Sequence, residues 1–171
     1  MKQKLKNYVP EFVYGAFDGI VTTFAVVAAA AGAGLSSVVV IVLGLANLVA
    51  DGFSMGASAY LSHRTGKDGH SRKASLFVGG ATFLAFLVAG AMPLVPYVYS
   101  SLAGDNADSN KLFLISCILA VFTFVLVGYG KSDRRKAKSI AASLAETVLL
   151  GLIAAGLSYF LGVGLASAFG I

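Results

Sequence analysis

Three side chains that could bind a metal follow one another at every fourth position of an apolar stretch. They are Asn47, Asp51 and Met55, within GLANLVADGFSMGASAY at residues 44–60. Residues four apart lie on one face of a helix, so the spacing predicts a stripe of an amide, a carboxylate and a thioether. A charged side chain at the centre of a bilayer costs roughly 2.5–3.5 kcal/mol on insertion scales. The stripe therefore predicts a polar path through a membrane.

The chemistry of this stripe favours a divalent transition metal. Carboxylates attract a cation into a region of low dielectric, and a thioether is a soft ligand that suits later first-row metals but not Mg²⁺ or Ca²⁺. We expect Fe²⁺ or Mn²⁺ as a transported substrate, with no permanently bound cofactor. Because the same carboxylates can take up protons when the metal leaves, we also expect metal and protons to be exchanged.

The composition places these residues in an integral membrane protein. Of the 171 residues, 57% are hydrophobic and 12% are charged, which is about half the charged fraction of a soluble domain. The net charge is +5, but the basic residues fall between apolar stretches. Membrane topology explains that pattern better than a nucleic-acid partner does, so none is expected.

Hydrophobic runs predict an all-α fold of one domain with five membrane-crossing helices. Each run is long enough for the roughly 30 Å of hydrocarbon at about 1.5 Å per residue. The expected spans cover residues 12–33, 38–61, 76–97, 112–130 and 139–169. Pro93 and Pro96 are expected to end the third span. The fifth is longer than one untilted crossing needs, so its start stands in the headgroup zone or it breaks near Gly162 and Gly164.

Positive charge separates between the two sides of this arrangement. With five crossings, twelve of the 13 Lys and Arg residues fall on one side and only Lys111 on the other. The basic side is cytosolic by the positive-inside rule, so the N-terminus is expected in the cytosol and the C-terminus outside. The twelve are Lys2, Lys4, Lys6, Arg64, Lys67, Arg72, Lys73, Lys131, Arg134, Arg135, Lys136 and Lys138.

Asp18, in the first span, is expected to lie at the depth of the stripe. At about 1.5 Å per residue, Asp18, Asp51 and Met55 are roughly 10 to 17 Å from the cytosolic ends of their helices. Thr22 extends the polar face of Asp18 by one turn. Glu146, in the fifth span, either reaches this layer as a proton-binding or structural carboxylate or sits nearer the interface.

A two-fold homodimer is also expected. Five helices from one chain enclose few polar faces, whereas two copies of Asp18 and Met55 would build a fuller ligand shell.

Each of these residues also has a structural explanation. Asn47 could bond to a neighbouring helix, and Met55 could fill a core. The Ala and Gly residues at 28–34 predict a close-packing surface. His63 and His70 are expected to be solvated in a short basic loop.

Three segments resemble the vacuolar iron transporter family. YGAFDGIVTTFAVVAAAAGAG and VLGLANLVADGFSMGASAYLS are similar to its paired first two helices, and ETVLLGLIAAGLSYFLG is similar to its last helix. The resemblance implies a homodimeric transporter that carries Fe²⁺, and often Mn²⁺, out of the cytosol in exchange for protons between the protomers. It also implies that Asp18 and Met55 are metal ligands.

The sequence departs from this family in two places. Iron-transporting members typically carry a cytosolic domain rich in Glu and Met between the second and third spans, where this chain has a short basic loop at residues 62–75. A path-lining Glu of some members aligns with Asn47. The change removes one carboxylate that would attract cations or accept a proton.

Two other functions remain open at the level of the sequence. Asp18 and Asp51 on adjacent helices could form the aspartyl dyad of an intramembrane enzyme, although FD and ADG stand where such proteases carry Tyr-Asp and Gly-x-Gly-Asp. The second alternative function is a membrane subunit that binds metal but does not transport it. We expect a transporter and no enzyme, in the cell membrane of a prokaryote or the vacuolar membrane of a eukaryote.

Overall fold

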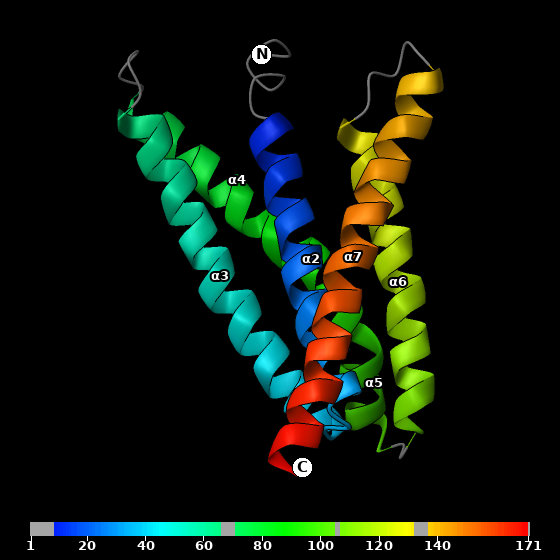
Figure 1. Ribbon diagram of the computed structural model, residues 1–171. Coiled ribbons are helices and arrows are strands. Elements are labelled where there is room, and N and C mark those ends of the chain that lie inside the picture. Colours follow the sequence, from blue (N-terminus) through cyan, green and yellow to red (C-terminus); the bar gives the residue numbers. More distant parts are fainter. Residues whose placement is uncertain (1–8, 66–70, 105–106, 132–136, 171) are drawn as a thin grey trace.

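The chain folds into a bundle of long helices (Figure 1). The computed structural model describes residues 9–65, 71–104, 107–131 and 137–170, and all regular elements among them are helical. The elements are α2 (Val9–Gly32), α3 (Ser37–Thr65), α4 (Arg72–Ala91), the 3₁₀ turn η1 (Met92–Leu94), α5 (Val95–Ala103), α6 (Ser109–Lys131) and α7 (Ala137–Phe169).

Five helical segments within the described residues are long and apolar enough to cross a membrane. This confirms the predicted all-α, five-span fold of a multi-pass membrane protein. The fifth helix runs through Gly162 and Gly164 without a break. The segments are Pro10–Gly32, Ser37–Thr65, Arg72–Ala103, Ser109–Lys131 and Ile140–Phe169.

The third span continues past the two prolines that were expected to end it. Pro93 lies at the start of η1 and Pro96 at the start of α5, where a missing backbone N–H is tolerated. The hydroxyl of Ser116, on α6, donates to the carbonyl oxygen of Pro93 at 2.7 Å. This bond satisfies a backbone group at the irregular turn, and the span ends only at Gly104, whose φ is 65°.

Helix α2 lies at the centre of the bundle and contacts α3, α4, α6 and α7 (Figure 1). Buried side chains from three helices form its core: Ile20, Phe24 and Val27 of α2, Ala85 of α4 and Phe124 of α6. These contacts hold α2 on several sides. The packing therefore fixes the positions of the side chains on the face of α2 that these helices leave uncovered.

Glycines bring neighbouring helices into backbone contact. A Cβ atom added to Gly79 of α4 would lie 2.6 Å from the carbonyl oxygen of Gly56 of α3, and one added to Gly15 of α2 would lie 2.6 Å from the carbonyl oxygen of Thr82. Apolar side chains gain little by leaving lipid for a helix contact, so close approach at small residues favours association in a membrane.

The predicted close-packing surface at residues 28–34 is confirmed. Ala30 is buried, and Gly32 lies against the backbone of Tyr159 in α7. The chain then turns at Gly34, whose φ of 67° favours glycine.

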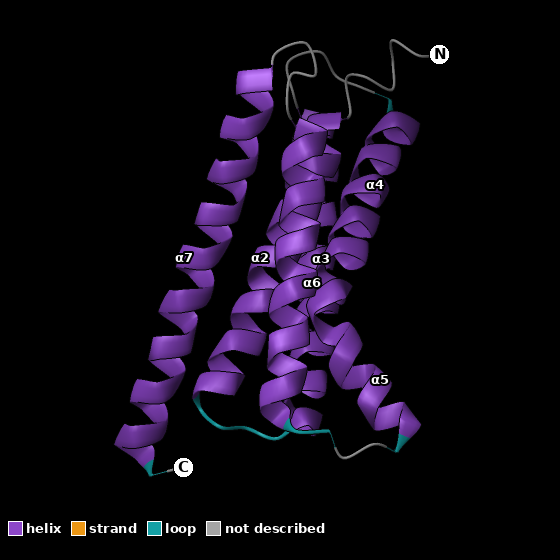
Figure 2. Ribbon diagram, turned by 90° about the vertical axis from the view of Figure 1, so that its right-hand side faces the viewer, coloured by secondary structure: helices purple, strands orange, loops and turns teal. Residues whose placement is uncertain are grey.

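One end of the bundle, here called the basic end, holds the start of α2 and the ends joined by the α3–α4 and α6–α7 connections (Figures 1 and 2). Four exposed basic residues are described there: Arg64, Arg72, Lys73 and Lys131. Lys111 lies near the opposite end. Lys2, Lys4, Lys6, Lys67, His70, Arg134, Arg135 and Lys136 lie outside the described residues.

Candidate functional site

The stripe on α3 lies along the edge of the contact between α3 and α4. Buried Gly52 and Gly56 face α4, whereas Ala50 and Ser54, on the other side of the stripe, are exposed. The half-buried residues between these two faces are Asn47, Asp51 and Met55. The stripe thus borders a packed seam on one side and the surface of the protomer on the other.

Helix α2 presents a second polar face, which carries Asp18 and Thr22. Both residues are half-buried. The Thr22 hydroxyl donates to the backbone carbonyl of Asp18 at 2.9 Å, so Thr22 can offer a cation only its oxygen lone pairs. The carboxylates of Asp18 and Asp51 lie near enough for the charge of one to act on the other. The two acids, on separate helices, therefore act on each other through their charges.

A cavity of about 260 Å³ lies between α2, α3 and α4 at the basic end. Met55, Ser58 and Ser62 line it from α3, and Glu11 and Tyr14 line it from α2. A thioether and a carboxylate thus border one space, together with several hydroxyl groups. We call this space the Glu11 cavity.

Glu11 is a candidate ligand that the residue pattern did not reveal. Its Oε2 atom is buried and makes no hydrogen bond within the described part of the chain. A buried carboxylate oxygen without a partner is costly, and a cation in the cavity would offset that cost. The available signal was spacing, since Glu11 precedes Asp18 by two helical turns on one face. Its place in the first turn of α2 also suits a plain helix-start residue.

Asn47 and Glu146 have different surroundings. The Nδ2 atom of Asn47 is buried and has no hydrogen-bond partner among the described residues. Glu146 of α7 pairs with Lys131 of α6, with 2.9 Å between Oε2 and Nζ, and both side chains are exposed. This ion pair joins α6 to α7, whereas the Glu11 cavity lies between α2, α3 and α4.

Of the two histidines expected to be solvated, His63 lies at the end of α3 and is half-buried, so the expectation is wrong for this residue. Nδ1 of His63 is 3.2 Å from Oγ of Ser75, so this contact links α3 to the start of α4. Across the described ranges, no three His, Cys, Asp or Glu side chains gather where they could hold a metal ion. The candidate ligands of one chain are therefore the pair Asp18 and Asp51 and the pair Glu11 and Met55.

Comparison with known proteins connects this arrangement to a family. The sequence profile of the VIT family matches residues 9–76 and 66–163. The two matched blocks overlap at residues 66–76, which form the connection between α3 and α4 and the start of α4. Together they include every candidate residue named above.

Several relatives share the name vacuolar iron transporter. The protein of Plasmodium falciparum is 24% identical over 225 residues, which cover 92% of this chain and 82% of that protein. Vacuolar iron transporter 1 of Eucalyptus grandis is 21% identical over 215 residues, with 88% and 84% covered. The protein of Toxoplasma gondii is 50% identical over 62 residues, but this stretch spans 36% of this chain and only 20% of that protein.

Proposed function

This chain belongs to the VIT family, and on that premise we propose that it transports a divalent transition metal, Fe²⁺ or Mn²⁺, along the polar faces of α2 and α3. The observation that carries the proposal is the Glu11 cavity, where a carboxylate and the thioether of Met55 line one space. The name of the relatives, vacuolar iron transporter, supports a metal substrate and a transporter without enzymatic chemistry.

Asp18 and Met55 are the proposed metal ligands within the membrane. The carboxylate supplies charge, and the thioether favours Fe²⁺ or Mn²⁺ over Mg²⁺ and Ca²⁺. Asp51 adds a second negative charge close to Asp18. Thr22 and Asn47 line the path and contribute oxygen atoms without charge.

The Glu11 cavity is the proposed entrance to this path. Glu11 lies about 10 Å before Asp18 along α2, given a rise of about 1.5 Å per residue. Met55 borders the cavity and follows Asp51 by one turn of α3. A metal ion would pass from Glu11 to Met55 and then to the two aspartates, and it would leave past Asn47 toward the opposite end.

The proposed direction is out of the cytosol. The charge pattern supports a cytosolic basic end and N-terminus, with the C-terminus outside. When the metal leaves, protonation of Asp18 and Asp51 would relieve the repulsion between two carboxylates in low dielectric. Inward movement of protons on these groups would then accompany outward movement of metal.

A two-fold homodimer would complete the ligand shell. Asp18 and Met55 are half-buried in one protomer, and Ala50 and Ser54 beside the stripe are exposed. A second copy over this surface would bring two carboxylates and two thioethers toward one axis and shield the path from lipid.

We further propose that this chain is a shortened family member. The alignment with the Plasmodium protein spans 225 residues, more than the 171 residues of this chain. The family blocks meet at residues 66–76. The connection is shorter than the expected loop at 62–75, because α3 runs to Thr65 and α4 begins at Arg72. Such a short basic connection in place of a metal-gathering domain would leave Glu11 as the first carboxylate that lines the path. Asn47, which stands where some family members have a Glu, would leave this chain with one carboxylate fewer along the path than those members.

Metal flux into proteoliposomes tests this function. The purified chain should move Fe²⁺ or Mn²⁺, with Co²⁺ and Zn²⁺ measured beside them to give its metal preference, and an opposing proton gradient should accelerate the movement. Asp18→Asn and Met55→Leu should each lower the flux at least about tenfold, because each removes a ligand. The Leu side chain keeps the volume of Met, and Asp108→Asn makes the same acid-to-amide change in an exposed loop. Full flux in the Asp18 and Met55 variants would refute the assignment.

The same preparation separates the two alternatives. An aspartyl dyad would use the same two acids, Asp18 and Asp51. Peptide cleavage that depends on Asp51 but not on metal would favour the enzyme. Metal binding without flux would favour a non-transporting subunit.

A further inference from the structure

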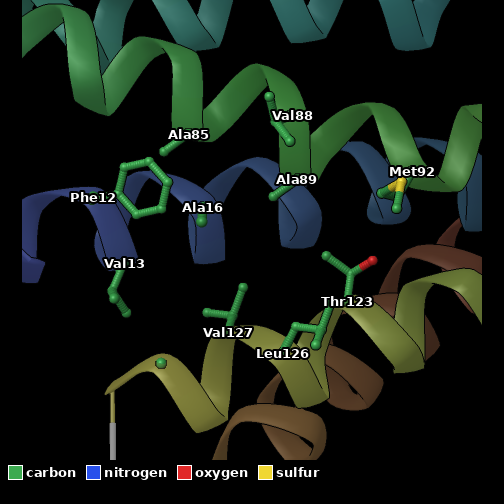
Figure 3. A pocket seen from close by; sticks show the side chains of 11 residues that line it. Phe12, Val13, Ala16, Ala85, Val88, Ala89, Met92, Thr123, Leu126 and Val127 are labelled. Atoms are coloured by element: carbon green, nitrogen blue, oxygen red, sulfur yellow. The ribbon is translucent and has the colours of Figure 1, made fainter.

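A larger cavity lies on the opposite face of α2 from Glu11 and Asp18. It has a volume of about 420 Å³ and lies between α2, α4 and α6 (Figure 3), within the roughly 300–1,000 Å³ of small-molecule sites. We call it the apolar slot. Its lining residues are Phe12, Val13, Ala16, Ala85, Val88, Ala89, Met92, Thr123, Leu126, Val127 and Gly130.

The lining of the apolar slot fits hydrocarbon and not water. Its one hydroxyl, that of Thr123, donates to the backbone carbonyl of Leu119 at 2.8 Å. A buried water needs two to four polar partners, which this lining does not supply. Val88 and Leu126 are 70% and 51% exposed, and both belong to membrane-spanning segments. The slot is therefore open to the lipid chains around the protein.

A smaller cavity adjoins the apolar slot between α2 and α6. It has a volume of about 360 Å³ and shares Val13 and Gly130 with the slot. Tyr14 and Lys131 also line it. An apolar cavity and a cavity with a cationic group thus lie side by side at Gly130. The first would suit the acyl chain of a lipid and the second its headgroup.

The two charged side chains at the smaller cavity, Lys131 and Glu146, have opposite charges. The Lys131 ammonium donates to Oε2 of Glu146 at 2.9 Å, which uses one of its three N–H groups. The remaining donors can bind a phosphate. Glu146 would repel a headgroup with net negative charge but attract an ammonium group on the same headgroup.

We propose that this chain binds one phosphatidylethanolamine molecule here, with an acyl chain in the apolar slot, the phosphate at Lys131 and the headgroup ammonium at Glu146. The site is independent of metal transport, because it uses the face of α2 opposite Glu11 and Asp18. The bound lipid would pack against the central helix α2, on the face opposite Glu11 and Asp18, and stabilise its position.

Gly130 offers a direct way to close the site. A Cβ atom added there would meet only Val13 Cγ2, at 4.0 Å, among the described atoms. Gly130→Leu should therefore place a bulky side chain where the two cavities adjoin, without a backbone clash. Gly80→Leu is the matched control, since a Cβ at Gly80 of α4 would have no described atom within 4 Å and Gly80 lines neither cavity.

Native mass spectrometry of the full chain, delipidated and then offered equal phosphatidylethanolamine and phosphatidylglycerol, tests the binding. The wild-type chain and Gly80→Leu should retain phosphatidylethanolamine. Gly130→Leu should retain about tenfold less, the loss expected when a good contact is removed. Equal retention in the two leucine variants would overturn the proposal. So would dissociation of an oligomer by Gly130→Leu with lipid retained, because a second copy would then fill the slot.

Two charge variants test the headgroup assignment. Lys131→Ala should lower retention of both lipids, and Glu146→Gln should abolish the preference for phosphatidylethanolamine over phosphatidylglycerol. Exchange of the pair, Lys131→Glu with Glu146→Lys, keeps an ion pair between α6 and α7 and so controls for folding. It should still lose lipid, because it places a carboxylate at the phosphate position. A wild-type preference for phosphatidylglycerol, or an exchanged pair that binds normally, would contradict the assignment.

Discussion

At the scale of residues, polar groups in the membrane-spanning helices differ in whether they find a hydrogen-bond partner within their own helix. The hydroxyls of Thr22, Thr82 and Thr123 each donate to a backbone carbonyl within one helical turn, so they satisfy themselves inside a helix. Glu11 Oε2 and Asn47 Nδ2 are buried without such a bond in the described chain. They belong to α2 and α3, the two helices that carry the proposed path. Thr23 Oγ1 shares this property in the core, and nothing in the structure explains it.

Glu11→Gln should weaken capture of the metal more than its passage. Loss of the carboxylate lowers the attraction of the Glu11 cavity for a cation, while Asp18 and Met55 remain. We expect the metal concentration for half-maximal flux to rise about tenfold, as for loss of one charge-assisted contact, with little change in the maximal rate. Initial rates of Mn²⁺ uptake into proteoliposomes measure both quantities.

Glu11→Asp is the matched control, because it keeps the charge and shortens the side chain by one methylene. It should stay within a few-fold of the wild-type concentration dependence. If the half-maximal metal concentration is unchanged in Glu11→Gln, Glu11 does not contribute to metal capture at the entrance.

At the scale of elements, the sequence predicts the number of spans well, because a backbone in lipid must form helices long enough to cross it. It does not predict which faces meet, since lipid-facing and buried positions are both apolar. Val40, which is 1% exposed, and Val42, which is 60% exposed, have the same residue type. The ion pair of Lys131 and Glu146 likewise cannot be predicted from the sequence, because it depends on how α6 packs against α7.

The crossing of α3 and α4 gives a prediction about packing. Gly79→Ala should destabilise the protein by about 1–3 kcal/mol, the usual cost of overpacking, because the added Cβ would lie 2.6 Å from the carbonyl oxygen of Gly56. Gly80→Ala should stabilise it by about 0.5–1 kcal/mol, since alanine is the better helix former in an open position. Thermal unfolding in detergent, followed by circular dichroism, compares these neighbouring variants. Equal midpoints would show that α3 and α4 do not meet at Gly79.

At the scale of the whole molecule, the protomer has a well-packed side and an open side. Helix α2 is held by α4, α6 and α7, whereas α3 leans away from α7 toward the basic end (Figure 1). Helices α2 and α3 carry the half-buried polar residues of the proposed path. A polar path in a membrane needs a cover that keeps lipid out. A second copy of the chain is the cover that we propose.

Disulfide cross-linking tests that assembly in the membrane. In a background with Cys117→Ala, which removes the one cysteine of the chain, Ser54→Cys places a thiol on α3 beside Met55. Two such thiols near a two-fold axis should bond, because a disulfide needs Cα atoms about 4.4–6.8 Å apart. Oxidation should therefore give a covalent dimer on a denaturing gel. Leu114→Cys is the matched control, since Leu114 is also exposed, at 62%, but lies on α6 and not on the helices that carry the proposed path. Cross-linking at position 114 and none at position 54 would place the partner against α6 and leave the path without its second set of ligands.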